Sequence, residues 1–281
     1  MRELCAAYPV QWVCEVWGCA RSSFYYQPRL RQDQPVRNAL HTLAGQWPTY
    51  GARRLTAELR RQGFAVNRKR VQRLMRQYGI VPQKRRKTIH TTQAGQGLRH
   101  YPNLVRHLTI VYPNQVWVAD ITYIQLRTEV VYLAMVMDVF TRVIRGWHLS
   151  RGLDQGLSLE ALTRALREGC PEIHHSDQGV QYAGTEYIAR LNALQIQISM
   201  SDVGAAWQNG YAERFMRTLK EEEVALAEYV DFTSAYQQIG QFIDEVYRHK
   251  RIHSALGYLT PAEYEQQWRA QTGAATQVVP F

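Results

Sequence analysis

The feature that most limits the fold of this chain is a dense series of β-type segments beginning at Trp117. Two stretches rich in β-branched and aromatic residues, 117–126 (WVADITYIQL) and 130–149 (VVYLAMVMDVFTRVIRGWHL), provide three strands within about 35 residues. Connections this short predict that the three strands pair in an antiparallel manner. A helix-only fold is therefore excluded for this part of the chain.

Helices and strands alternate after these three strands. Amphipathic periodicity predicts a helix at 157–169, a strand at 172–176, a helix at 185–194 and a strand at 196–201. Two further helices are predicted at about 209–228 and 233–249. The order β-β-β-α-β-α-β-α predicts an α/β fold with a mixed five-stranded sheet and flanking helices.

The two parts of the 281-residue chain differ in charge. Residues 1–100 contain 19 Lys and Arg but only 4 Asp and Glu, a balance of +15, whereas residues 101–281 contain 15 and 20, a balance of −5. Clustered basic side chains bind phosphate backbones because they release condensed counterions. The first part is therefore predicted to bind DNA, the alternative being a basic surface that only keeps the chain in solution.

Helix-turn-helix patterns support the DNA-binding prediction. Residues 9–27 show a short pattern of this kind, and residues 51–80 show a stronger one that breaks at Gly63, with Asn67 as the expected N-cap of its second helix. The expected apolar stripe consists of Leu55, Leu59, Phe64, Val66, Val71, Leu74 and Met75. The basic side chains expected to contact DNA are Arg53, Arg54, Arg68, Lys69, Arg70 and Arg73. A helix with a solvated basic face is the alternative.

Residues 82–113 have the composition of a linker. They begin with Lys84, Arg85, Arg86 and Lys87, which are expected to contact DNA, and continue with little periodicity. We expect this segment to follow a DNA backbone rather than to pack. The expected organisation is a short helix-turn-helix-like segment (1–35), a basic helix-turn-helix domain (36–81), the linker (82–113), the α/β core (114–228) and a C-terminal helix and tail that complete the core (229–281).

Three carboxylates occupy positions where a solvated helix face does not explain them. Asp120 lies within the first predicted strand, Asp177 follows the short strand at 172–176, and Glu213 lies in the first turns of a helix. Carboxylates brought to one edge of a sheet repel one another unless a cation binds them, and oxygen ligands favour Mg²⁺ or Mn²⁺. A hydrogen-bonded structural role is the alternative for each acid.

Several motifs in one order give the chain a family resemblance. The segments WVADITYI, HSDQGVQY, SMSDVGAAWQNGYAERFMRTLKEE and YRHKRIHSALGYLTPAEY resemble the integrase-core transposases of bacterial insertion sequences. The basic segment YGARRLTAELRRQG, with NRKRVQRLMRQYGI after it, is similar to the helix-turn-helix module ahead of that core. One departure is Gln208-Asn209-Gly210, where family members often carry Asp-Asn-Ala.

This resemblance implies a ribonuclease H-like fold and a DNA transposase that cleaves and joins strands at insertion-sequence ends. It implies that Asp120, Asp177 and Glu213 are the catalytic Asp-Asp-Glu triad, binding two Mg²⁺ or Mn²⁺ ions, and that Lys220 contacts the element end. Lys220 follows Glu213 by seven residues, so both lie on one helix face. A structure-specific nuclease on the same fold and a non-enzymatic DNA-binding regulator are the alternatives.

The expected partners are double-stranded DNA at the element ends and the target, other copies of this chain on DNA, and an upstream-frame product of the same element. The sequence contains no run of about 18 uncharged apolar residues, which excludes a membrane-spanning helix. Its N-terminus also lacks the apolar stretch of a secretory signal. We therefore expect a cytoplasmic protein that associates with the nucleoid when bound to DNA.

Overall fold

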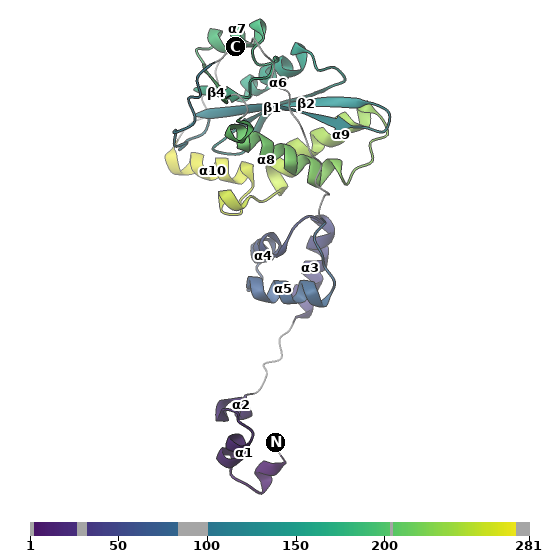
Figure 1. Cartoon of the computed structure of the whole chain (residues 1–281), viewed down its shortest axis with the longest axis vertical. Helices are drawn as coiled ribbons and strands as arrows, with labels where there is room; N and C mark the ends of the chain where they lie inside the picture. Colours follow the sequence, from purple (N-terminus) through teal and green to yellow (C-terminus); the bar gives the residue numbers. More distant parts are fainter. Residues whose placement is uncertain (1–2, 27–32, 84–100, 203–204, 274–281) are drawn as a thin grey trace.

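The computed structural model describes residues 3–26, 33–83, 101–202 and 205–273. Figure 1 shows a short helical segment, a three-helix module and an α/β core following one another along the chain. The first segment contains η1 (Leu4–Ala6), α1 (Val10–Val16) and α2 (Arg21–Tyr25). Among the described residues, no helix is long and apolar enough to cross a membrane.

The core is built on the predicted mixed sheet of five strands. They are β1 (Val116–Gln125), β2 (Val130–Asp138), β3 (Ile144–Ser150), β4 (Ile173–Ser176) and β5 (Gln197–Met200). Their order is β3-β2-β1-β4-β5. The pairs β1–β2 and β2–β3 are antiparallel, as predicted, while β1–β4 and β4–β5 are parallel. The chain therefore crosses over the sheet between β3 and β4, and α6 (Gln155–Glu168) makes this connection.

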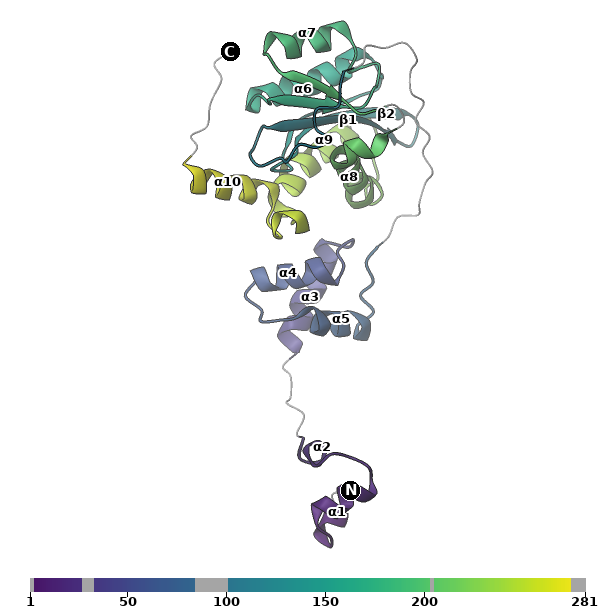
Figure 2. The same ribbon diagram turned by 60° about the vertical axis from the view of Figure 1, so that its left-hand side comes forward.

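Helices cover both faces of the sheet (Figures 1 and 2). One face carries α6 and α7 (Thr185–Ala193); the other carries α8 (Gly210–Leu219), α9 (Phe232–Gln241) and its π-helical continuation η4 (Phe242–Lys250). Alternation along β1 divides the core, since Trp117 and Ala119 pack on the α6–α7 side and Val116 and Val118 on the α8–α9 side. Gly146 lets α6 approach closely, because a Cβ there would lie 2.2 Å from the Ala161 carbonyl oxygen.

The helix predicted at about 209–228 has a different extent. A 3₁₀ turn, η2 (Ala206–Asn209), leads into α8, and the winding becomes π-helical in η3 (Lys220–Val224) before the helix ends. The periodicity of apolar residues in the sequence does not reveal where an α-helix becomes π-helical. The chain closes with η5 (Ser254–Leu256) and α10 (Pro261–Thr272), which starts at a capping box of Thr260 and Glu263.

The three-helix module consists of α3 (Gln34–Gln46), α4 (Ala52–Arg61) and α5 (Arg68–Gln77). The expected apolar stripe forms its core, with six members buried and Phe64 partly buried. Asn67 caps α5 as predicted, its side-chain oxygen accepting a hydrogen bond from the Arg70 amide at 2.8 Å. The break between α4 and α5 lies at Gly63, whose φ of +87° suits glycine.

This module shares its core with a segment much later in the chain. Ile252, which is fully buried, belongs to the apolar cluster of the module. The Ile252 amide donates a hydrogen bond to the Tyr50 hydroxyl at 3.2 Å. Arg61 of α4 also pairs with Glu263 of α10 at 2.6 Å. The three-helix module is therefore docked on the C-terminal part of the α/β core.

The prediction that residues 82–113 do not pack was wrong for their second half, and Lys84, Arg85, Arg86 and Lys87 lie outside the described residues. The side-chain amide of Asn103 donates to the side-chain oxygen of Gln208 at 2.8 Å. The backbone amide of Leu104 donates to the Ser199 hydroxyl at 2.9 Å. Val105 and Ile110 pack against the core. Irregular backbone packs here without the periodicity that reveals a core element in a sequence.

A buried ionic cluster centred on Glu222 joins the two parts. Its carboxylate accepts two hydrogen bonds from Arg251, at 2.6 and 2.8 Å, and one from Arg54 of α4 at 3.1 Å. The side chains of Glu222 and Arg251 are only 8% and 3% exposed. Burial alone would raise the pKa of Glu222, but the bonds and charges of Arg251 and Arg54 outweigh it and lower this pKa. The charge pairing therefore stabilises the docked arrangement.

We expect Glu222→Gln to lower the free energy of unfolding by about 3 kcal/mol near neutral pH, because it leaves Arg251 buried without its counter-charge. Since folding lowers the Glu222 pKa, its contribution is present above its ordinary pKa of 4.5 and is lost as pH falls through the folded value. The deficit of the variant should shrink accordingly in urea unfolding below pH 4.5. Glu245→Gln, which breaks an exposed pair with Lys250, is the control and should cost less than about 1 kcal/mol. Equal effects of the two variants would contradict the expectation.

Candidate active site

Asp120 is the central acidic residue of the core. It lies in β1 on the same side as Val118, which faces α8, and it is half-buried. One carboxylate oxygen accepts a hydrogen bond from the Ile121 amide at 2.9 Å. Burial, together with the charges of Asp177 and Glu213, raises the pKa of Asp120 to about 8 against the opposing effects of the Ile121 amide and Lys220. Negative charge is therefore concentrated at this point of the sheet.

Asp177 reaches the same place from the neighbouring strand. In the parallel β1–β4 pair, Val116 faces Ile173 and Val118 faces His175, so the register carried two residues further brings Asp177 level with Asp120. Neighbouring strands lie about 4.8 Å apart, which places the two carboxylates side by side. An oxygen of Asp177 accepts from the Gly179 amide at 2.9 Å, and burial raises the pKa of this carboxyl group.

Glu213 approaches from α8, where it lies in the exposed first turn. The start of this helix is fixed to β1 by Asn209, whose amide nitrogen donates to the Ala119 carbonyl at 2.9 Å, directly before Asp120. The sequence showed Asn209 beside Glu213 without a role for it; its place just before a helix start is the signal that could have indicated one. The charges of Asp177, after the end of β4, and of Glu213, on α8, thus both act on Asp120 in β1.

Lys220 also lies beside this group. Its ammonium nitrogen is 4.7 Å from the ring centre of Tyr123 in β1, and its charge lowers the pKa of Asp120. The predicted common face of Glu213 and Lys220 agrees with this placement, because both side chains influence the same carboxyl group. The contact of Lys220 with DNA stays a prediction.

The chemistry of these donors fits a divalent cation. All three side chains offer oxygen atoms only, which suits Mg²⁺ or Mn²⁺, and a cation would relieve the repulsion that raises the pKa of Asp120. As placed here, the described residues contain no group of three or more His, Cys, Asp or Glu side chains drawn together tightly enough to hold a metal ion. Glu213 is the exposed member, on the helix opposite the two aspartates.

Two histidines precede Asp177 but serve the packing of β4. His175 is hydrogen-bonded to Ser199 at 2.8 Å and to Ser201 at 3.2 Å, and His174 to the Tyr187 hydroxyl at 2.9 Å. Burial lowers the pKa of His174 to about 3 and that of His175 to about 4, so both are neutral near pH 7. They position the strand that ends at Asp177.

The predicted DNA-contacting residues of the three-helix module divide into two groups. Arg53, Arg68 and Lys69 are exposed on α4 and α5. Arg70 and Arg73 instead pair with Asp33, and Arg54 pairs with Glu222. The expectation that Arg54 faces DNA disagrees with its position in the interface with the core, because its guanidinium is engaged within the protein.

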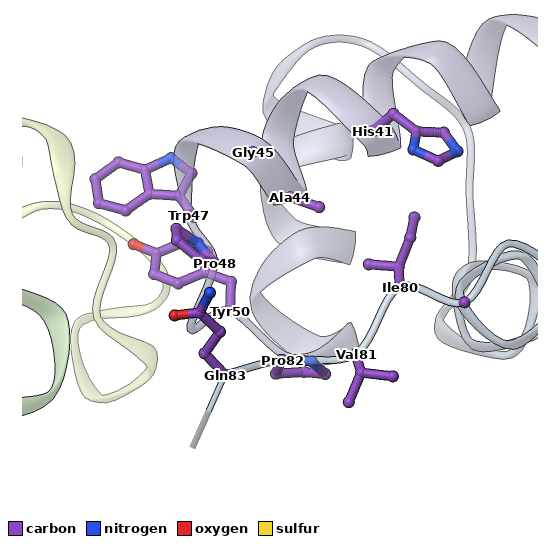
Figure 3. Close-up of a pocket in the computed structure, with 11 residues that line it drawn as sticks. His41, Ala44, Gly45, Trp47, Pro48, Tyr50, Ile80, Val81, Pro82 and Gln83 are labelled. Carbon is purple, nitrogen blue, oxygen red and sulfur yellow. The ribbon is translucent and has the colours of Figure 1, made fainter. Parts of the chain in front are cut away.

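A cavity of about 330 Å³ lies away from the carboxylates, in the three-helix module (Figure 3). Figure 3 shows Trp47, Pro48 and Tyr50 along one side and Ile80 and Val81 along the other. The rings of Trp47 and Tyr50 are stacked, with centroids 4.7 Å apart. No carboxylate lines this cavity, so it is not part of the acidic site.

A mixed sheet of this order, with carboxylates contributed by the central strand, its parallel neighbour and a helix across the face, defines a ribonuclease H-like core of the polynucleotidyl transferase class. Comparison with known families gives the same result. Two integrase core domain models match residues 111–206 and 194–261, and an HTH-like domain model matches residues 32–88.

Individual relatives cover nearly the whole chain. An "uncharacterized 31 kDa protein" of insertion element IS600 from Shigella sonnei is 33% identical over 91% of this chain and 98% of its own length. The transposase for insertion sequence element IS904 from Lactococcus lactis is 36% identical over 77% of this chain and 87% of its own. Among solved structures, the simian T-cell lymphotropic virus intasome, in complex with PP2A regulatory subunit B56 gamma, is 14% identical with a TM-score of 0.50, covering 87% and 77% of the two chains. That likeness shows the fold alone.

The chain belongs to the integrase-core transposases of bacterial insertion elements. The resemblance inferred from the sequence motifs is thus confirmed, as are the ribonuclease H-like fold and the enzyme class.

The raised pKa of Asp120 predicts the pH dependence of stability without metal. Folding raises this pKa from 3.8 to about 8, so the folded state binds the proton more tightly and loses stability as pH rises between these values. Asp120→Asn is neutral throughout, and its melting temperature relative to wild type should rise from pH 5 to pH 9 in EDTA. Glu186→Gln, on the exposed start of α7, is the control and should show no such trend. A difference in melting temperature between Asp120→Asn and wild type that stays constant from pH 5 to pH 9 would refute the raised pKa of Asp120.

Proposed function

We propose that this DNA transposase cleaves and joins strands at insertion-sequence ends with Asp120, Asp177 and Glu213 as its catalytic carboxylates. The observation that supports this assignment is the β1–β4 register that brings Asp177 level with Asp120, together with the effect of the Asp177 and Glu213 charges on Asp120. The integrase core models that match this region support it further.

The three carboxylates would hold two Mg²⁺ or Mn²⁺ ions, which supply an activated hydroxyl nucleophile and stabilise the leaving oxygen. The protein's own residues do the positioning. The β1–β4 register holds Asp120 and Asp177 level, and Asn209 anchors the helix that carries Glu213. Lys220, beside Asp120, has the charge to bind a phosphate of the element end.

The proposed DNA surface of the module consists of the exposed Arg53, Arg68 and Lys69. The basic run Lys84, Arg85, Arg86 and Lys87, which follows in the sequence and lies outside the described residues, is also proposed to contact DNA. The docking of this module on the core supports a role in presenting DNA to the acidic site, since Arg61 and Tyr50 connect it to the C-terminal segment. Self-association on DNA and cooperation with an upstream-frame product stay predictions.

The catalytic assignment predicts that Asp120→Asn, Asp177→Asn and Glu213→Gln each abolish Mg²⁺-dependent cleavage of labelled element-end DNA while leaving binding in a gel-shift assay intact. Glu186→Gln, an exposed acid on α7, is the matched control and should retain wild-type cleavage. Appreciable cleavage by any one of the three variants would remove that residue from the catalytic set.

Joining separates the proposed transposase from its alternatives. Because one phosphodiester bond replaces another, a pre-cleaved end should be joined to target DNA without ATP, and Lys220→Ala should reduce this joining. Denaturing gels distinguish joined from merely shortened strands. Shortened fragments alone, even with the upstream-frame protein added, would favour the nuclease. The absence of both shortened and joined strands would favour the regulator.

The proposed DNA surface predicts a specific salt dependence. The full chain with Arg68→Ala and Lys69→Ala should bind duplex DNA more weakly, with a log–log salt slope lowered by roughly 0.9 for each phosphate that the variant no longer neutralises. A chain with Arg167→Ala and Lys250→Ala, which removes the same charge from exposed positions of the core, should keep the wild-type slope. Equal slopes for both double variants would exclude the α5 surface.

A further inference from the structure

Tyr182 lies in the turn that follows Asp177. Its amide donates a hydrogen bond to the Gly179 carbonyl at 3.0 Å, and the Gly179 amide in turn donates to the Asp177 carboxylate at 2.9 Å. The side chain is only 3% exposed and packs into the apolar cluster between the sheet and α7. Its ring meets that of Tyr187 at an edge, with centroids 5.5 Å apart. The backbone of one short turn therefore fixes both Tyr182 and Asp177.

The two neighbouring tyrosines differ in how their hydroxyl groups are satisfied. Tyr187 is equally buried, and its hydroxyl is hydrogen-bonded to His174 at 2.9 Å. The Tyr182 hydroxyl is buried as well, but it has no hydrogen-bond partner among the described residues. A buried hydroxyl without a partner lowers stability, and phenylalanine would fill the same space without this cost. Packing alone therefore does not account for a tyrosine at this position.

The surroundings of the Tyr182 hydroxyl indicate what it can bind. Burial raises the pKa of the Tyr182 phenol, and the charges of Asp120 and Asp177 act in the same direction. The hydroxyl thus keeps its proton and remains a donor. A hydrogen bond from a neutral donor to an ionised carboxylate is among the stronger ones in proteins.

We propose that Tyr182 is a positioning residue of the active site, whose hydroxyl donates a hydrogen bond to the Asp120–Asp177 carboxylate pair when that pair binds Mg²⁺. The inference rests on the proposed assignment of these two acids as metal-holding residues. Hydrogen bonds to ligating carboxylates orient them, and the loss of such a partner typically weakens metal binding 10- to 100-fold. One turn brings the two side chains near each other, because a Cβ added at Gly179 would lie 2.9 Å from an Asp177 carboxylate oxygen and 3.4 Å from the Tyr182 ring.

The test compares full-length Tyr182→Phe and Tyr187→Phe. In EDTA, Tyr182→Phe should melt at or above the wild-type temperature, because it removes an unsatisfied group, whereas Tyr187→Phe should melt lower, because it breaks the bond to His174. In Mg²⁺ titrations, the concentration that half-saturates both the rise in melting temperature and DNA cleavage should increase about 10-fold for Tyr182→Phe. It should stay at the wild-type value for Tyr187→Phe.

Two outcomes would overturn the positioning role. A Tyr182→Phe protein with the wild-type Mg²⁺ requirement shows that the hydroxyl does not act on the carboxylates, whatever its melting temperature. A wild-type protein that neither gains stability from Mg²⁺ nor cleaves DNA with it overturns the proposed metal site itself, and the role of Tyr182 with it. Asp120→Asn, which should abolish the Mg²⁺-induced rise, identifies the carboxylates as the source of that rise.

Discussion

The parallel pairing of β4 with the central strand β1 is the constraint on which the site depends. It brings Asp177 level with Asp120 without a dedicated loop, because strands in register carry their ends to the same height. It also requires a crossover over the sheet, which α6 makes, with Gly146 permitting the close approach. The opposite face is left to α8, which carries Glu213 in its first turn.

Two acids of this protein, Glu222 and Asp120, differ in how far the surrounding residues compensate their charge. Glu222 is surrounded by Arg54 and Arg251, and its pKa is lowered, so its charge is compensated within the protein. At Asp120, burial and neighbouring acids raise the pKa, with only Lys220 and a backbone amide opposing them. Internal compensation stabilises a fold, whereas charge left uncompensated costs stability that a bound cation can restore. The direction of the pKa shift thus differs between the interface of the three-helix module with the core, where the pKa is lowered, and the candidate active site, where the pKa is raised.

Much of this structure could be predicted from the sequence because its signals are local. Strand propensity and helix periodicity predicted the five strands, and the Asn67 cap and the apolar stripe defined the three-helix module. Motif order predicted the family. Contacts distant in sequence left no such signal: Arg54 was expected on DNA because its partner is 168 residues away, and the packing of Leu104 follows no period. That the buried Tyr182 hydroxyl has no hydrogen-bond partner among the described residues likewise becomes clear only from the structure.

The burial of Ile252 among the helices of the DNA-binding module has a consequence for synthesis on the ribosome. Helices α3 to α5 emerge early, but the side chain that completes their core, and the amide that satisfies the Tyr50 hydroxyl, emerge only after the whole sheet and η4 have been translated. A module whose helices are made early is thus completed late. A nascent or prematurely terminated chain lacks part of its DNA-binding unit, so full assembly of that unit coincides with completion of the catalytic core.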